Sequence, residues 1–170
     1  MTSPARRPLL FLDVDGPLIP FGATPARHPA PAGAGNPLLN RLAPHHGPRL
    51  AALACEPVWA TTWGDDANDC LAPLLGLPPL PVVPWPEPSD LDALDTWNGL
   101  HWKTRALVTW AAGRPFAWAD DELTAADRTW VTTHHPAPAL LHRVDPRHGL
   151  TGDDYATLGA WLRQQAPELP

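Results

Sequence analysis

Residues 9–16, LLFLDVDG, decide the fold of this 170-residue chain. Four apolar residues are followed at once by Asp13 and Asp15, and then by a glycine and a proline. A short apolar run that stops at a turn signal is typical of a strand buried in a sheet. We therefore predict a buried strand over residues 9–14, with both aspartates at its carboxyl end.

The same kind of run recurs along the chain and alternates with helical patterns. Further short apolar runs, each predicted to be a strand, occupy residues 58–60, 80–85, 116–119 and 139–144. Helical spacing, or helix start and stop signals, predicts helices within 37–54 and over 65–75, 101–112 and 151–165. Strands that alternate with helices form βαβ units. We therefore predict an α/β fold with a central, mainly parallel sheet that is covered on both faces.

The composition is that of one globular domain spanning residues 1–170. Hydrophobic residues make up 44% of the chain and charged residues 18%, which suits a single core at this length. Residues 19–37 are dense in proline, glycine and alanine and have no periodicity, so we expect a loop that forms a flap over the strand end. Residues 139–165 are expected to close the domain with a strand and a helix.

Apolar runs and cysteines exclude several classes of protein. No apolar run approaches the roughly 20 residues that a membrane span needs, and Asp13 interrupts the N-terminal run too early for an export signal. We therefore expect no membrane partner and a cytoplasmic location. Cys55 and Cys70 are too few for a disulfide framework or a zinc site. The histidine pairs 45–46 and 134–135 are expected in proline-flanked loops without metal.

The charge of the chain bears on its partners. A net charge of −6 argues against a domain that binds nucleic acid by neutralising many phosphates, although a small anionic substrate could still bind at a local cation. Lys103 is the only lysine among twelve basic residues. Its presence in an arginine-rich chain suggests a position that requires the ammonium group of lysine, which a guanidinium group cannot replace.

Polar side chains follow three of the predicted strands. They are Asp13 and Asp15, Thr61 and Thr62, and Asp120 and Asp121. Because ligands of parallel sheets bind outside the carboxyl ends of the strands, we expect all three groups to face one crevice. Either acidic pair alone has a purely structural explanation, as a turn or a helix cap. Together they offer the hard oxygen ligands that Mg²⁺ requires, and Thr61 and Lys103 suit a bound phosphoryl group.

The order of these residues resembles the haloacid dehalogenase (HAD) superfamily of phosphohydrolases. The four motifs of that family are similar to FLDVDGPL at 11–18, VWATTW at 58–63, HWKTRAL at 101–107 and FAWADDEL at 116–123. The resemblance spans residues 9 to about 123 and implies a three-layer Rossmann-like HAD fold. The short spacings between the motifs imply that there is no large cap domain. More narrowly, the motifs are similar to small HAD domains associated with RNA-repair proteins.

The resemblance also implies a mechanism. Asp13 would be the nucleophile that forms an aspartyl phosphate, and Asp15 the general acid and base. Mg²⁺ would be held by Asp13, by the backbone carbonyl of Asp15 and by Asp120, with Asp121 in support. The family usually has threonine or valine where this chain has Pro17. This departure affects the geometry of the loop beyond Asp15.

The phosphate-binding residues implied by the resemblance are Thr61 and Lys103, with Thr62 as the alternative to Thr61. The chain is therefore expected to be a Mg²⁺-dependent phosphatase acting on a phosphate monoester. Nucleotides or nucleic-acid phosphate ends are candidate substrates, although the net charge does not favour nucleic acid. Capless members of the family tend to act on larger substrates.

Other interpretations stay open at this point. A catalytically idle HAD-like module could bind a phosphorylated or RNA partner, and a phosphotransferase would share the same motifs. A response-regulator receiver domain is excluded, because its acidic pair precedes the phosphorylated aspartate. Trp63 and Trp102 are either core residues or lie at the site and stack on a base. The three acidic residues at 90, 92 and 95 are expected to form a solvated loop or helix start.

Overall fold

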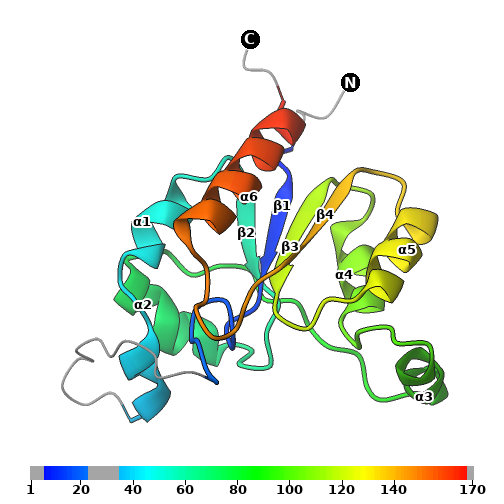
Figure 1. Ribbon diagram of the computed structural model, residues 1–170, viewed down its shortest axis with the longest axis horizontal. Coiled ribbons are helices and arrows are strands. Elements are labelled where there is room, and N and C mark those ends of the chain that lie inside the picture. Colours follow the sequence, from blue (N-terminus) through cyan, green and yellow to red (C-terminus); the bar gives the residue numbers. More distant parts are fainter. Residues whose placement is uncertain (1–5, 23–34, 168–170) are drawn as a thin grey trace.

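The sheet has four strands, all parallel, in a computed structural model that describes residues 6–22 and 35–167. The strands are β1 (Leu9–Leu12), β2 (Glu56–Trp59), β3 (Phe116–Asp120) and β4 (Ala139–Arg143), in the order β2-β1-β3-β4. Figure 1 shows β1 and β3 at the centre, with α6 crossing in front of the sheet. The prediction of an α/β fold with a parallel, Rossmann-like sheet is confirmed.

The two central strands are apolar up to Asp120, the last residue of β3, because both of their faces are covered. Every residue of β1 and of β3 is buried. Successive side chains of a strand point to opposite faces. Leu10 and Leu12 accordingly join one hydrophobic cluster, and Leu9 and Phe11 join the other. The two clusters are the cores on the two faces of the sheet.

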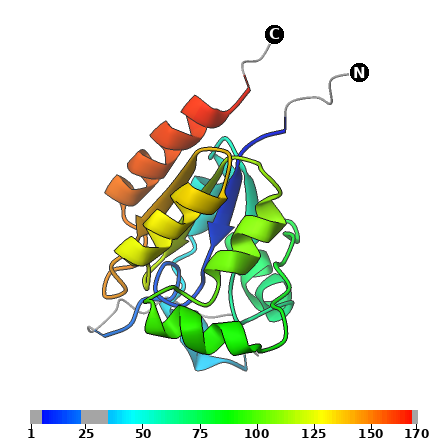
Figure 2. The same cartoon turned by 90° about the vertical axis from the view of Figure 1, so that its right-hand side faces the viewer.

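Different helices supply the two cores. One core contains side chains from α1 (His46–Ala51), α2 (Ala72–Leu75) and the 14-residue α6 (Gly152–Gln165). The other contains side chains from α4 (Thr104–Ala111) and α5 (Ala125–His134). Figure 2 shows α6 on one side of the sheet and α4 on the other. None of the helices in the described ranges combines the length and apolarity needed to cross a membrane.

The prediction of a strand over residues 80–85 is wrong. The segment makes one isolated bridge, Trp59 with Val82, beside β2. The backbone N–H of Trp59 donates to Pro81, and that of Val83 donates to Trp59. Because Pro81 and Pro84 have no N–H group, the ladder cannot extend beyond this bridge.

Helix α5 was not expected, and the acidic segment expected to be a loop or a helix start does begin a helix. Helix α3 (Asp90–Trp97) and helix α5 each begin at a capping box, in which a hydroxyl residue and an aspartate three positions later bond to each other's backbone N–H groups. Figure 1 shows α3 standing apart from the sheet. The expectation of three solvated acids is wrong for Asp95, which is buried and makes a two-point ion pair with Arg105 at 2.6 and 2.7 Å.

The other helices fall close to their predicted positions. The helix expected over 65–75 consists of η2, a π-helical turn (Ala67–Leu71), followed by α2, and it ends at Gly76 with a left-handed φ of 65°. The helix expected over 101–112 begins at Thr104. Helix α6 begins after its cap residue Thr151, which is one of the two residues, Thr151 or Asp153, expected to open it.

The segment expected to be a flap is described in part. Residues 23–34 lie outside the described residues, and Pro37–Arg41 forms the short 3₁₀ helix η1. The histidine pairs are not purely loop residues. His46 is the first residue of α1 and hydrogen-bonds to the Tyr155 hydroxyl at 2.8 Å, and His134 is the last residue of α5.

Candidate active site

A cavity of about 190 Å³ lies at the carboxyl ends of β1, β2 and β3. These strands end at the same edge because they are parallel and in register, with Leu12 beside Trp59 and beside Ala119. The cavity is lined by six polar and two aromatic residues: Asp13, Asp15, Thr62, Lys103, Asp121, Glu122, Phe21 and Trp102. Side chains that follow three strands and one that precedes α4 thus meet in one place.

Lys103 joins two of the strand ends. Its Nζ lies 3.0 Å from Oδ1 of Asp13 and 2.8 Å from Oδ2 of Asp120, and all three side chains are buried. Burial lowers the pKa of Lys103, but the charges of Asp13 and Asp120 outweigh that effect and raise it. The ammonium group is therefore a fixed positive charge between the two carboxylates.

The carboxyl groups are more numerous than this one cation can neutralise. Burial raises the pKa of Asp13 to about 7, an effect that Lys103 opposes and that Asp120 increases. Burial, with the charge of Asp120, raises the pKa of Asp121 to about 6. A further cation beside these groups would favour their ionised forms.

Three of the carboxylates form a set that could hold a metal ion. One oxygen each from Asp13, Asp120 and Asp121 lies within 4.8 Å of the others. Mg²⁺ prefers carboxylate and water oxygens at about 2.0–2.1 Å in octahedral geometry. The donor type, the closeness of the oxygens and the raised pKa values of Asp13 and Asp121 therefore fit a hard divalent cation. The Asp15 carboxylate is not in this set, although Asp15 lines the cavity.

The turn after β1 brings the first motif against the fourth. Gly16 has a φ of +100°, and a Cβ atom added to it would lie 2.8 Å from Cγ of Asp121. Its backbone N–H donates to Ile19, and the N–H of Leu18 donates to Val14, which closes the turn. Only glycine combines this backbone conformation with so close an approach to Asp121.

The two threonines after β2 have different environments. Thr61 is fully buried, and its Oγ1 accepts a hydrogen bond of 3.2 Å from the backbone N–H of Trp63. Thr62 is exposed and lines the cavity. The structure thus brings Thr62, and not Thr61, to the cavity wall.

The two tryptophans beside the motifs also differ. Trp102 lines the cavity and is 48% exposed. Trp63 is not part of the wall, but its indole Nε1 donates a hydrogen bond of 3.1 Å to Oδ2 of Asp15. The expectation of an aromatic ring at the site therefore holds for Trp102, while Trp63 contacts a site carboxylate through its N–H.

Asp127 supports the site and was missed by the sequence analysis. Its Oδ1 accepts from the backbone N–H of His101 and from the Thr104 hydroxyl, both at 2.7 Å. Its Oδ2 accepts from the N–H and the hydroxyl of Thr124, both at 2.9 Å. These bonds tie the residues on both sides of Lys103 to the start of α5. The pattern of Thr124 followed three positions later by Asp127 is a capping signal that could have found α5.

His101 is the second missed residue. Its Nδ1 accepts a hydrogen bond of 3.1 Å from the backbone N–H of Lys103, so its proton is on Nε2 in the neutral form. That Nε2 is buried and has no hydrogen-bond partner among the described residues, and it lies 3.4 Å from an oxygen of Glu122 and 3.8 Å from one of Asp120. Burial lowers the pKa of His101. No sequence pattern marks this residue.

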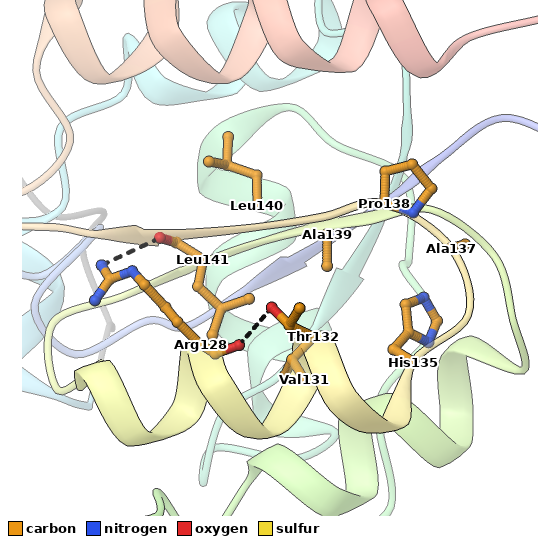
Figure 3. A pocket seen from close by; sticks show the side chains of 9 residues that line it. All are labelled: Arg128, Val131, Thr132, His135, Ala137, Pro138, Ala139, Leu140 and Leu141. Atoms are coloured by element: carbon orange, nitrogen blue, oxygen red, sulfur yellow. Dashed lines mark hydrogen bonds between the residues drawn. The ribbon is translucent and has the colours of Figure 1, made fainter.

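A larger cavity of about 390 Å³ lies between α5 and the edge strand β4 (Figure 3). Its ionisable lining residues are Arg128 and His135, and it contains no carboxylate. Both side chains donate hydrogen bonds to backbone carbonyls. Arg128 donates to Leu141 at 3.3 Å (Figure 3), and His135 Nε2 donates to Arg114 at 2.8 Å. The cavity lacks the charged groups that the strand-end site brings together.

Comparisons with protein-family models, with curated proteins and with solved structures found no match to this chain.

Proposed function

We propose that this chain is a Mg²⁺-dependent phosphatase of the HAD type that hydrolyses a phosphate monoester through an aspartyl phosphate. The observation that carries the proposal is the contact of Lys103 with both Asp13 and Asp120, at 3.0 and 2.8 Å, inside a set of carboxylates with space beside it. The parallel sheet and the order of the four motifs along it support assignment to the HAD superfamily.

In the proposed first step, an oxygen of Asp13 attacks the phosphorus atom. The bond from phosphorus to the ester oxygen breaks as the bond to Asp13 forms, and the leaving alkoxide takes a proton from Asp15. In the second step Asp15 accepts a proton from water, which attacks the same phosphorus. Inorganic phosphate leaves and the Asp13 carboxylate is restored.

The residues that would hold Mg²⁺ are Asp13, Asp120 and Asp121, together with the backbone carbonyl of Asp15. The ion would neutralise charge on the phosphoryl oxygens and align them for the attack. Lys103 serves the same oxygens with a compact cation. Its contacts to Asp13 and Asp120 hold its ammonium group in position before substrate arrives.

Thr62 is the favoured hydroxyl donor to the phosphoryl group because it lines the cavity, whereas Thr61 is fully buried. Replacing Thr62 with valine should raise KM and lower kcat/KM by about tenfold, the usual effect of one lost hydrogen bond to a charged group. Replacing Thr61 with valine should act mainly on stability. The reverse result would assign the phosphate contact to Thr61.

The test of the function is hydrolysis of 4-nitrophenyl phosphate with Mg²⁺ and with excess EDTA. The wild-type chain should turn over only with Mg²⁺, and Asp13→Asn, which keeps the shape and removes the charge, should reduce kcat at least a thousandfold. The control is Asp69→Asn, which changes an exposed aspartate outside the cavity in the same way.

Four results would contradict the proposal. Metal-independent turnover would rule out the proposed role of Mg²⁺, and normal activity in Asp13→Asn would rule out Asp13 as the nucleophile. Absence of turnover in protein that binds Mg²⁺ and phosphate would favour the idle binding module, and transfer to an added alcohol in preference to water would favour a phosphotransferase.

A further inference from the structure

The rim of the strand-end cavity carries two exposed aromatic rings. Phe21 is 41% exposed and Trp102 is 48% exposed, and both line the cavity that holds Asp13 and Lys103. Isolated exposed aromatic residues are common on protein surfaces. Here the two rings come from different segments of the chain and meet at one small polar cavity.

Neighbouring rings hold Trp102 in place. The Trp85 ring packs against it edge-on, with centroids 4.8 Å apart and planes at 69°, and the His101 ring lies beside it at 5.8 Å and 26°. Trp85 is itself fixed by a hydrogen bond of 3.0 Å from its Nε1 to the carbonyl of Thr61. Trp102 therefore offers an exposed aromatic surface whose orientation is set before a ligand binds, which lowers the entropy cost of binding.

Phe21 is fixed through its backbone. Its N–H donates a hydrogen bond of 2.7 Å to the carbonyl of Pro146, in the segment that follows β4. Two chain segments far apart in sequence thus set the position of the Phe21 backbone, from which the ring reaches the cavity. With about 190 Å³, the cavity itself is smaller than the roughly 300–1,000 Å³ typical of sites that enclose a whole drug-sized ligand. A phosphoryl group bound at Asp13 would leave the rest of its ester at the rim.

The charges at the rim restrict what this remainder can be. Four carboxylates line the cavity, and Lys103 is the one cation among the described lining residues. Arg143 donates to the backbone carbonyl of Asp121 at 3.0 Å but does not line the cavity. Glu122 has a side chain that is 70% exposed. A second anionic group on the ligand would therefore meet negative charge that a single bound divalent cation does not cancel.

We propose that the site selects phosphate monoesters whose leaving alcohol carries a planar ring without a second negative charge, with Trp102 and Phe21 as the residues that recognise the ring. This inference rests on the proposed phosphatase function. Both aromatic side chains stack on flat groups of many kinds, so the selection is for planarity and charge. Nucleoside monophosphates meet this description, whereas bisphosphates and RNA ends with neighbouring phosphates do not.

A matched pair of ligands tests the ring. Benzylphosphonate and cyclohexylmethylphosphonate have nearly the same size and the same anionic group, and neither can be hydrolysed, so their binding in Mg²⁺ is measured by calorimetry independently of turnover. The wild-type chain should bind the planar ligand about tenfold more tightly, as stacking on one aromatic side chain predicts. Trp102→Ala should abolish the preference, Trp102→Phe should keep most of it, and Phe21→Leu should reduce it.

The control variant is Trp97→Ala. Trp97 is 87% exposed on α3 and does not line the cavity, so its removal should leave the preference unchanged. Equal binding of both phosphonates by the wild-type chain, failure to bind either, or a preference that survives both Trp102→Ala and Phe21→Leu would overturn the inference.

A third ligand tests the charge. The wild-type chain should bind 4-carboxybenzylphosphonate at least tenfold more weakly than benzylphosphonate, and Glu122→Gln should narrow this gap. Equal affinity of the wild-type chain for benzylphosphonate and 4-carboxybenzylphosphonate would overturn the restriction on charge.

Hydrolysis of the corresponding phosphate esters separates this inference from the function on which it rests. Turnover of benzyl phosphate and of cyclohexylmethyl phosphate at equal kcat/KM would support the phosphatase function and overturn the selection for a planar ring. Ring-selective binding of the phosphonates without turnover of any ester would support the recognition of the ring and overturn the phosphatase.

Discussion

The indole Nε1 of Trp63 donates a hydrogen bond of 3.1 Å to Oδ2 of Asp15, and this bond joins the segment after β2 to the segment after β1. Asp15 is the proposed proton donor and acceptor of the reaction. This hydrogen bond restricts the orientation of the Asp15 carboxylate, which lines the cavity. We therefore expect Trp63 to act through Asp15 as a positioning residue.

Trp63→Phe should lower kcat about tenfold, because it keeps an aromatic ring and removes the indole N–H that donates to Asp15. The loss should be larger for alkyl phosphates than for 4-nitrophenyl phosphate, because a poor leaving group depends more on protonation by Asp15. Steady-state kinetics on both substrates measures this difference. An equal loss on both, or a similar loss in the exposed control Trp97→Phe, would show that Trp63 has only a structural role.

Gly16→Ala should weaken Mg²⁺ binding at least tenfold. The new Cβ would lie 2.8 Å from Cγ of Asp121 on a backbone with φ of +100°, so either the turn or the Asp121 carboxylate must move. Titration calorimetry with Mg²⁺ measures the affinity. The control is Gly35→Ala, where an added Cβ has no neighbour within 4 Å. Unchanged affinity in Gly16→Ala would show that Asp121 does not contribute to the metal site.

Asp127→Ala should lower the free energy of unfolding by about 3 kcal/mol, because four hydrogen bonds to a buried carboxylate are lost together. Urea denaturation measures the change. The matched control is Asp92→Ala, which removes an aspartate from the equivalent capping position of α3, where it is exposed. That change should cost about 1 kcal/mol or less. Equal losses in the two variants would mean that Asp127 acts only as a helix cap.

The metal-free protein should lose stability as pH rises from about 4 to about 7. Because the pKa of Asp13 is raised from 3.8 to about 7, the native state binds more protons than the unfolded state in this range, and the free energy of unfolding therefore falls with pH. Asp121, with a pKa raised to about 6, adds to the fall up to that pH. The effect of Asp13 is at most about 4 kcal/mol.

Urea denaturation at pH 4.5 and pH 7.5 in EDTA checks this dependence. The wild-type chain should lose more stability between the two pH values than Asp13→Asn, and saturating Mg²⁺ should remove the difference by favouring the ionised carboxylates. A wild-type slope no steeper than that of Asp13→Asn would contradict the raised pKa of Asp13.

The predictions from sequence succeeded where one segment determines its own environment. The strands β1 and β3 are apolar runs that are buried on both faces. Such runs are typical of parallel sheets, whichever helices cover them, so their place in the sheet could be predicted. The meeting of Asp13 with Asp120 and Asp121 followed from the same rule, because parallel strands present their carboxyl ends at one edge.

The failures concern residues whose role depends on a distant partner. The segment at 80–85 is an exception, because the prolines that limit it to one bridge lie within the segment itself. Asp95 is acidic like a surface residue, but Arg105 allows it to be buried. The bonds of Asp127 to His101 and of Trp63 to Asp15 join positions 26 and 48 residues apart, and nothing in either local pattern indicates the pairing.

The most direct measurement is chemical trapping of the phosphorylated residue. The chain is mixed with excess 4-nitrophenyl phosphate and Mg²⁺, quenched in acid during turnover, and reduced with borohydride, which converts an aspartyl phosphate to homoserine. Peptide mass spectrometry should find homoserine at position 13 in the wild-type chain and none in samples quenched without substrate or prepared from Asp13→Asn. Turnover accompanied by homoserine at another aspartate, or by an unmodified Asp13, would contradict the central claim that Asp13 is the nucleophile.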